Sequence, residues 1–119
     1  MAKVSLEKLN EIDGFVGAAL VDSSSGMVLG THGGGNLNLE IAAAGNTQVV
    51  QSKRKTIRSL RLDDAIEDLL ITLKKQYHLI RPLERNDSMF LYLALNREKA
   101  NLAMARHELR DFETTLDFK

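Results

Sequence analysis

The chain has 119 residues, 44% of them hydrophobic, and no cysteine, which fits one cytoplasmic domain over residues 1–119 and excludes disulfides, thiol catalysis and cysteine metal sites. Its 16 lysines and arginines equal its 16 aspartates and glutamates, so no net charge attracts nucleic acid or an anionic membrane. The start MAKVSLEKLN lacks the apolar core of a signal peptide, and no apolar run approaches the roughly 20 residues of a membrane span, so no membrane insertion is expected.

Hydrophobic patterning predicts the elements of the first part of the chain. Ser5 is placed to cap a short helix that ends at Ile12. The run FVGAALV, residues 15–21, is apolar on both alternating faces, which is typical of a central strand covered on both sides. The turn residues DSSSG then lead into MVLGT, residues 27–31, so that the two strands form a hairpin.

A long helix is predicted next, capped by Asn36 or Asn38 and ending near Leu60. Three strands follow at residues 65–73, 77–83 and 88–95, joined by short polar connections. Asn96 is then expected to cap a final helix whose apolar residues recur at helical spacing: Leu102, Ala105, Leu109, Phe112 and Leu116. The order α-β-β-α-β-β-β-α with short connections predicts neighbouring antiparallel strands and helices on both faces of the sheet.

The segment THGGGN, residues 31–36, precedes the long helix and resembles two kinds of catalytic or binding loop. An HGGG oxyanion loop serves a serine in a G-x-S-x-G turn, which the sequence lacks. A phosphate loop ends in G-K-[ST], whereas Gly35 is followed by Asn36 and Leu37. We interpret the segment as a connector; an anion held by backbone amides at the helix start is the alternative that stays open.

The other chemical motifs are incomplete. His107-Glu108 begins the zinc motif H-E-x-x-H, but Asp111 stands where the second histidine is required. His78, in the strand at 77–83, is interpreted as a packed or surface histidine rather than a ligand. The sequence therefore predicts no catalytic residue, no metal site and no cofactor, and hence no enzyme.

The long helix has more apolar surface than one sheet contact requires. An arc of about a third of its circumference is apolar and wide enough to face a sheet; it comprises Leu39, Ala42, Ala43, Val49, Val50, Ile57 and Leu60. Ile41 lies off this arc, while Asn46 and Lys53 lie within it, which is unusual for the dry core of a monomer. These features predict a subunit interface.

Two seams with seven-residue spacing divide this helix surface. Ala43, Val50 and Ile57 are expected to face the chain's own sheet, and the second seam is expected to face the long helix of a partner. The strand at 65–73, as a sheet edge, would otherwise expose apolar side chains. The predicted dimer interface comprises Ala42, Asn46, Val49, Lys53, Leu60, Leu69 and Ile71, and the second seam also includes Leu39.

Asn46 has a special place in this hypothesis. In a two-fold dimer one residue of the second seam lies near its own copy, and an asparagine there can donate an amide hydrogen bond to its mate and accept one from it. The alternative is that Asn46 bonds locally on a half-exposed helix.

Cations crowd the end of the long helix: Lys53, Arg54, Lys55, Arg58 and Arg61. They complement the helix dipole, and acidic residues follow directly. The region has no aromatic residue for stacking, which argues against nucleic acid. A polar rim around a protein interface is more plausible, with Arg54 and Arg58 as partner-binding residues.

The chain resembles the roadblock (dynein light chain) family, in its bacterial or archaeal single-domain form. The resemblance is carried by the segment IDGFVGAALVDSSSGMVLG at residues 12–30, by the element order and by the glycine-containing lead into a long helix. The most specific part is Gly14 with the strand at Gly17-Ala18-Ala19, followed by a turn ending in Gly26 and MVL. The resemblance covers essentially the whole chain. The glycine-rich residues 32–36 are a departure from it.

This resemblance implies a five-stranded antiparallel sheet with the long helix on one face and the terminal helices on the other. It implies a homodimer, or a dimer with a related roadblock chain, in which the long helices pair and the third strands join edge to edge. Family members are non-enzymatic scaffolds and regulators of small Ras-like GTPases, or subunits of dynein motors, and they offer no catalytic residue to carry over.

A second function remains open, a PAS-like or profilin-like module that senses a small ligand. Such a module needs an apolar pocket with a few convergent polar groups. The small residues Gly17, Ala18 and Ala19 indicate close packing of helix on sheet instead. Two tyrosines, four phenylalanines and no tryptophan also leave little aromatic lining for a flat cofactor.

Overall fold

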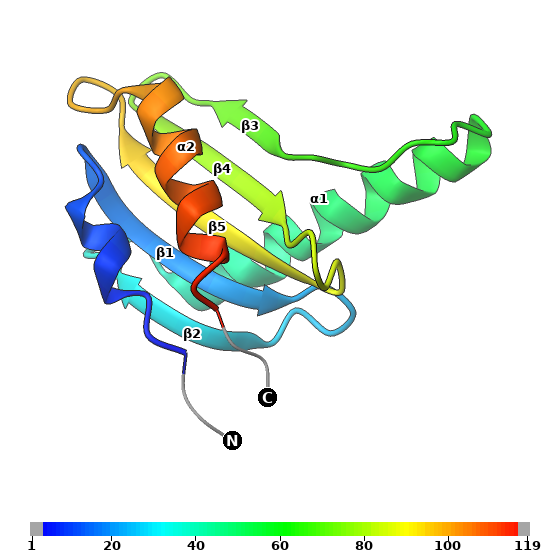
Figure 1. The fold of residues 1–119 in the computed structure, drawn as a ribbon, viewed down its shortest axis with the longest axis horizontal. Helices are drawn as coiled ribbons and strands as arrows, with labels where there is room; N and C mark the ends of the chain where they lie inside the picture. Colours follow the sequence, from blue (N-terminus) through cyan, green and yellow to red (C-terminus); the bar gives the residue numbers. More distant parts are fainter. Residues whose placement is uncertain (1–3, 117–119) are drawn as a thin grey trace.

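A five-stranded antiparallel sheet forms the centre of the computed structural model, which describes residues 4–116 (Figure 1). The strands are β1 (Phe15–Asp22), β2 (Val28–Gly33), β3 (Leu69–Thr72), β4 (Gln76–Pro82) and β5 (Met89–Asn96). Their order across the sheet is β2-β1-β5-β4-β3, so β2 and β3 are the two edge strands. The predicted sheet is confirmed.

The helices cover opposite faces of the sheet. The long helix α1 (Leu39–Ser59) lies on one face, and the 3-10 helix η1 (Glu7–Glu11) and the helix α2 (Leu102–Glu113) lie on the other (Figure 1). Because successive side chains of a strand point to opposite faces, β1 contributes Ala19 and Val21 to the core under α1, and Ala18 and Leu20 to the core under α2. The predicted placement of the helices is confirmed.

Asparagine side chains cap both main helices. Asn38 caps α1, since its Oδ1 accepts from the backbone N–H groups of Glu40 and Ile41 at 3.0 Å each. For the final helix the prediction of Asn96 was wrong. Asn96 is still part of β5 and accepts from the N–H of Glu98 in the turn that follows, so the cap of α2 is Asn101.

Two predicted elements are shorter in the structure. The first helix is a five-residue 3-10 turn whose N-cap is Leu6 rather than the predicted Ser5, and the Ser5 hydroxyl makes only a long contact of 3.4 Å with the N–H of Glu7. The strand predicted at 65–73 pairs with β4 only over Leu69–Thr72. Just before it, the Asp68 carboxylate binds the Arg106 guanidinium of α2, with Oδ2 3.1 Å from Nε, and the preceding residues run outside the sheet.

The glycine-rich segment forms the corner between β2 and α1. β2 ends at Gly33, directly after His32. From Gly33 the chain turns, and Gly33, Gly34 and Gly35 have positive φ angles of 69°, 107° and 52°. A Cβ placed on Gly17 would lie 2.8 Å from the Cα of Gly34, so the two backbones approach more closely than any side chain permits. The glycines therefore serve a sharp turn at the sheet edge, and the segment is a connector as interpreted.

A buried ion pair fastens α2 to β4. The Nε of Arg81 lies 2.8 Å from Oε1 of Glu113, and Oε2 of Glu113 accepts from the backbone N–H of Glu84 at 2.7 Å. Arg81 is 3% exposed and Glu113 is 6% exposed. The sequence analysis missed this pair.

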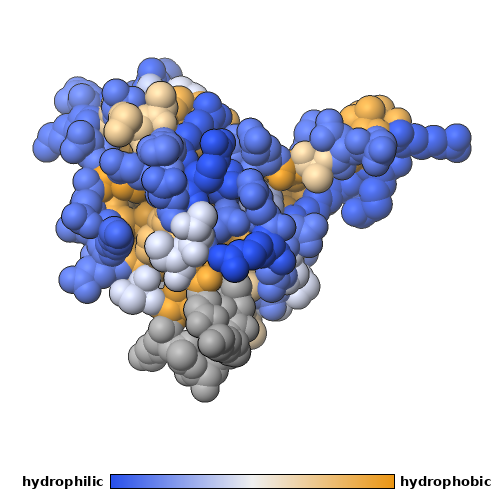
Figure 2. Space-filling view, in the orientation of Figure 1, coloured by the Kyte–Doolittle hydropathy of each residue, from blue (hydrophilic) through white to orange (hydrophobic). Residues whose placement is uncertain are grey.

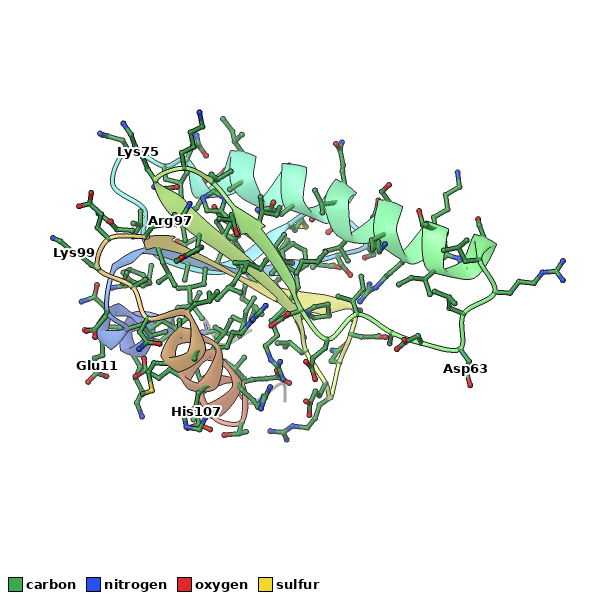
Figure 3. All side chains as sticks on the ribbon, turned by 90° about the horizontal axis from the view of Figure 1, so that it is seen from above. Glu11, Asp63, Lys75, Arg97, Lys99 and His107 are labelled. Atoms are coloured by element: carbon green, nitrogen blue, oxygen red, sulfur yellow. The ribbon has the colours of Figure 1, made fainter. Side chains whose placement is uncertain are left out.

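The second half of α1 projects beyond the sheet. Figure 1 shows that this half runs past the strands and that the chain returns beside it to β3, and Figure 3 shows Asp63 at the far end. We call residues 53–68 the arm. Leu60 and Leu62 in the arm are 62% and 52% exposed, and Figure 2 shows hydrophobic side chains near its end.

We expect that Glu113→Leu lowers the free energy of unfolding by about 3 kcal/mol, because it removes the buried counter-charge of Arg81 and leaves only the exposed Glu84 carboxylate, 3.1 Å from Nη2. Chemical denaturation measures this change. Glu108→Leu on the same helix is the control and should cost less than about 1 kcal/mol. The double variant Arg81→Met with Glu113→Leu should regain most of the loss, and equal losses in the single and double variants would contradict this account.

Candidate functional site

Part of the sheet face on the α1 side has no helix of its own chain over it. α1 packs against β1 and β2 and leaves the sheet where the arm begins. Leu69 and Ile71 of β3 and His78 of β4 point to this face and are only half-buried. The end of the sheet at β3 therefore presents apolar side chains beside an edge strand.

A chain of shallow hollows follows the side of α1 that overlooks this face. The first, of about 320 Å³, is lined by Leu37, Asn38, Ile41, Ala42, Gly45, Asn46, His78 and Tyr92. The second, of about 430 Å³, shares Gly45 with it and reaches Val49, Lys53 and Leu69. The third, of about 310 Å³, shares Lys53 and Leu69 and extends along the arm to Leu60 and Leu62. We call these three hollows together the α1–β3 groove.

The structure places most of the predicted interface residues along this groove. Ala42 and Asn46 are half-buried in its first part, Val49 and Lys53 line its middle with Leu69, and Leu60 lies in its last part. Ile71 lies on the same sheet face, in register with His78 of β4. Ile41, which the predicted interface did not include, is the most exposed large apolar residue of the helix at 71%.

The two predicted seams need two corrections. Ala43 and Val50 are fully buried between α1 and the sheet as predicted, but Ile57 is only half-buried and lies in the arm, beyond the sheet. Leu39, however, is 8% exposed and packs into the chain's own core, so the outward seam begins at Asn46. Thr47, which the analysis missed, also faces the core.

Thr47 fits that apolar position because its hydroxyl donates to the carbonyl oxygen of Ala43 at 2.7 Å. A threonine in a helix that bonds back one turn satisfies its own polar group. Hydrophobic spacing did not predict the buried position of Thr47, because threonine counts as a polar residue.

His78 forms the polar centre of the first part of the groove. Its Nε2 lies 2.8 Å from Oε1 of Gln76, and its Nδ1 lies 3.2 Å from the hydroxyl of Tyr92, whose ring meets the imidazole edge-on. Burial lowers the pKa of His78 below its usual range and raises the pKa of Tyr92 to about 12. Of the two positions considered for His78, packed or at the surface, the structure shows a half-buried ring packed against Tyr92.

The two predicted partner-binding residues have different surroundings. Arg54 is half-buried and donates to the carbonyl oxygen of Asp87 at 2.7 Å and to the Ser23 hydroxyl at 3.3 Å, so it fastens α1 to two turns of its own chain. Arg58 is exposed and, like Arg54, lines a further hollow of about 600 Å³ between the arm and the end of β4. Lys53, Lys55 and Arg61 are exposed as well.

Residues 4–116 contain no group of three or more histidines and carboxylates placed to hold a metal ion. His107 instead lies 3.3 Å from the Asp111 carboxylate, between Nε2 and Oδ2, one turn along the exposed side of α2. No helix in the described part of the chain is both long and apolar enough to cross a membrane.

The fold is similar to that of bacterial proteins of known structure. A roadblock/LC7 domain from Streptomyces avermitilis superposes with a TM-score of 0.78 at 15% identity, covering 92% of this chain and 88% of that one. The gliding protein MglB from Thermus thermophilus gives 0.76 at 14% identity, over 91% and 79% of the two chains. A second MglB structure, with a tetrameric arrangement, gives 0.75 at 14% identity over the same shares.

At the level of sequence, no protein-family model and no curated protein matches the chain. At these identities the superpositions establish the fold alone. They agree with the resemblance carried by residues 12–30 and by the element order, and the chain has the fold of the bacterial roadblock domains.

Proposed function

We propose that the protein is a non-enzymatic, dimeric regulator or scaffold of a small Ras-like GTPase, or a subunit of a motor complex, and that it acts in the cytoplasm. The observation that carries the proposal is the α1–β3 groove beside the half-buried face of β3. A second copy of the chain, or a related roadblock chain, is the proposed occupant of this surface.

The apolar surface argues for such an occupant. Ile41, Val49 and Leu60 expose large apolar side chains along one helix, beside Leu69 and Ile71 of β3. Contiguous exposed apolar surface of this kind marks association sites. The edge strand β3 is short, but it reads LLIT and carries neither a charge nor a proline, two of the usual features that prevent edge-to-edge pairing.

Asn46 remains the proposed residue nearest the two-fold axis. It is half-buried on the groove side of α1, between the small residues Ala42 and Gly45 on one side and Val49 on the other. Small residues allow a second helix to approach closely. An Asn46 pair across the axis would fix the register of the two helices.

The proposed GTPase contact uses the exposed cations of the arm. Roadblock proteins regulate Ras-like GTPases, and this function comes to the chain through its resemblance and its fold. Arg58 remains the leading candidate of the two predicted residues, since Arg54 is already bound within its own chain. Exposed cations speed the encounter with an acidic surface of a partner.

The ligand-sensing function is not proposed, because the space between α1 and the sheet is filled in the described part of the chain. Ala43, Val50, Phe90 and Tyr92 have no exposed surface there. The hollow of about 600 Å³ lies outside this layer, and charged side chains form much of its lining.

We expect the wild-type protein to be a dimer at micromolar concentration, with twice the 13.3 kDa chain mass in light scattering. Val49→Asp should raise the dimer dissociation constant at least about tenfold, because each copy would bring a carboxylate into the apolar contact. Ala44→Asp, on the exposed side of α1 away from the groove, is the matched control and should leave the dimer unchanged. A monomeric wild type would contradict the proposal.

We further expect the protein to bind a Ras-like GTPase encoded in the same genome and to change its rate of GTP hydrolysis or its localisation. Arg58→Glu should weaken binding at least about tenfold at low salt, measured by calorimetry, because it reverses an exposed charge in the contact. Lys75→Glu is the control, since Lys75 lies at the opposite end of the molecule from the arm (Figure 3). Equal affinity of both variants would argue against the arm as the GTPase contact.

A further inference from the structure

His78 is held as a neutral imidazole by two different hydrogen bonds. We assign the tautomer from its partners: Oε1 of Gln76 can only accept, so Nε2 carries the proton, and Nδ1 is left to accept from the Tyr92 hydroxyl, whose oxygen lies 3.2 Å from Nδ1 and 3.4 Å from Nε2. Since the Tyr92 hydroxyl keeps its proton well above neutral pH, it acts as a donor. A proton added at Nδ1 would make the Tyr92 hydroxyl an acceptor instead of a donor, and would leave a cation whose hydrogen-bond partners are both neutral.

No charged group compensates a cation at this position. The other side chains that line the first part of the groove are uncharged, namely Leu37, Asn38, Ile41, Ala42, Asn46 and Tyr92. Ile71 of β3 and Ala94 of β5 lie beside His78 in the sheet, and Tyr92 is the titratable group that faces it. Lys74 and Lys75, in the turn before β4, are exposed cations and would oppose a positive charge.

We propose that protonation of His78 dissociates the dimer, so that self-association through the α1–β3 groove is lost in mildly acidic conditions. This inference rests on the proposed dimer, in which a second copy covers the groove. Covering the groove removes the remaining water from an imidazole whose neighbours are neutral. The protonated ring then has no solvent and no carboxylate to stabilise it.

The sign of the effect follows from proton linkage. A second copy that buries His78 lowers its pKa further, so the separate chains bind more protons than the dimer in the pH range between the two values. Dissociation is therefore favoured as the pH falls below the pKa of His78 in the separate chain, which burial already holds below the ordinary histidine value of about 6.5. Because each dimer carries two copies of His78, the dissociation constant rises by up to about a hundredfold per pH unit within that range.

Sedimentation of the full chain at pH 7.5 and pH 5.5 tests the proposal. We expect the dimer dissociation constant of the wild type to rise at least about tenfold at pH 5.5. His78→Gln retains an amide donor and an oxygen acceptor but carries no charge, and its dissociation constant should be nearly the same at both pH values. His32→Gln and His107→Gln lie outside the groove and should keep the wild-type pH dependence.

The outcomes separate this inference from the proposed function. A wild-type dimer of equal stability at both pH values overturns the role of His78 and leaves the dimer proposal intact. A pH dependence of the dissociation constant that persists in His78→Gln has the same two consequences. A wild type that stays monomeric at pH 7.5 overturns the dimer proposal itself. Should His78→Gln fail to fold, an NMR titration of the wild-type His78 ring decides, since its pKa must be lower in the concentrated dimer than in the dilute chain.

Discussion

The direction in which α1 leaves the sheet determines most of the surface described above. Glycines with positive φ angles turn the chain at the end of β2, Asn38 starts the helix directly afterwards, and Arg54 ties its second half to two turns. A helix of 21 residues is about 31 Å long, whereas a strand of eight residues spans about 26 Å. Fixed at its start and crossing β1 and β2, α1 extends past the sheet as an arm and leaves β3 uncovered.

The sequence predicted those parts of the fold that depend on local pattern. Strand alternation, turn residues and the helical spacing of apolar residues located the five strands and the two main helices, because these signals come from neighbouring residues. The features that were predicted wrongly or missed depend on contacts between residues far apart in the chain. Asp68 meets Arg106, and Arg81 meets Glu113, from elements far apart in the chain, and no spacing rule relates them. Asn96 failed as a cap because its pairing with Gln76 keeps it in β5.

The candidate site was predictable to a similar extent. Helical spacing identified the outward side of α1 from Asn46 onward, whereas Leu39 was misplaced because its side chain packs beside the glycines Gly17 and Gly34, which leave room for it in the core. His78 gave no signal of its position, since its strand carries polar residues on both alternating faces, Gln76 on the same face as His78 and Arg81 on the other. In the sequence Arg54 and Arg58 are equivalent cations near the end of the long helix. In the structure Arg54 instead donates to backbone and side-chain oxygens of two turns of its own chain, a contact that only the three-dimensional arrangement reveals.

The polar residues of the groove set how strong an association it can support. A wholly apolar face would favour a permanent contact and would also invite non-specific association. Asn46 and His78 interrupt the apolar surface at its centre, so part of the gain from burying Ile41 and Val49 is offset by desolvation of polar groups. In the proposed dimer these polar residues would favour one register over others and would limit the gain in free energy from association.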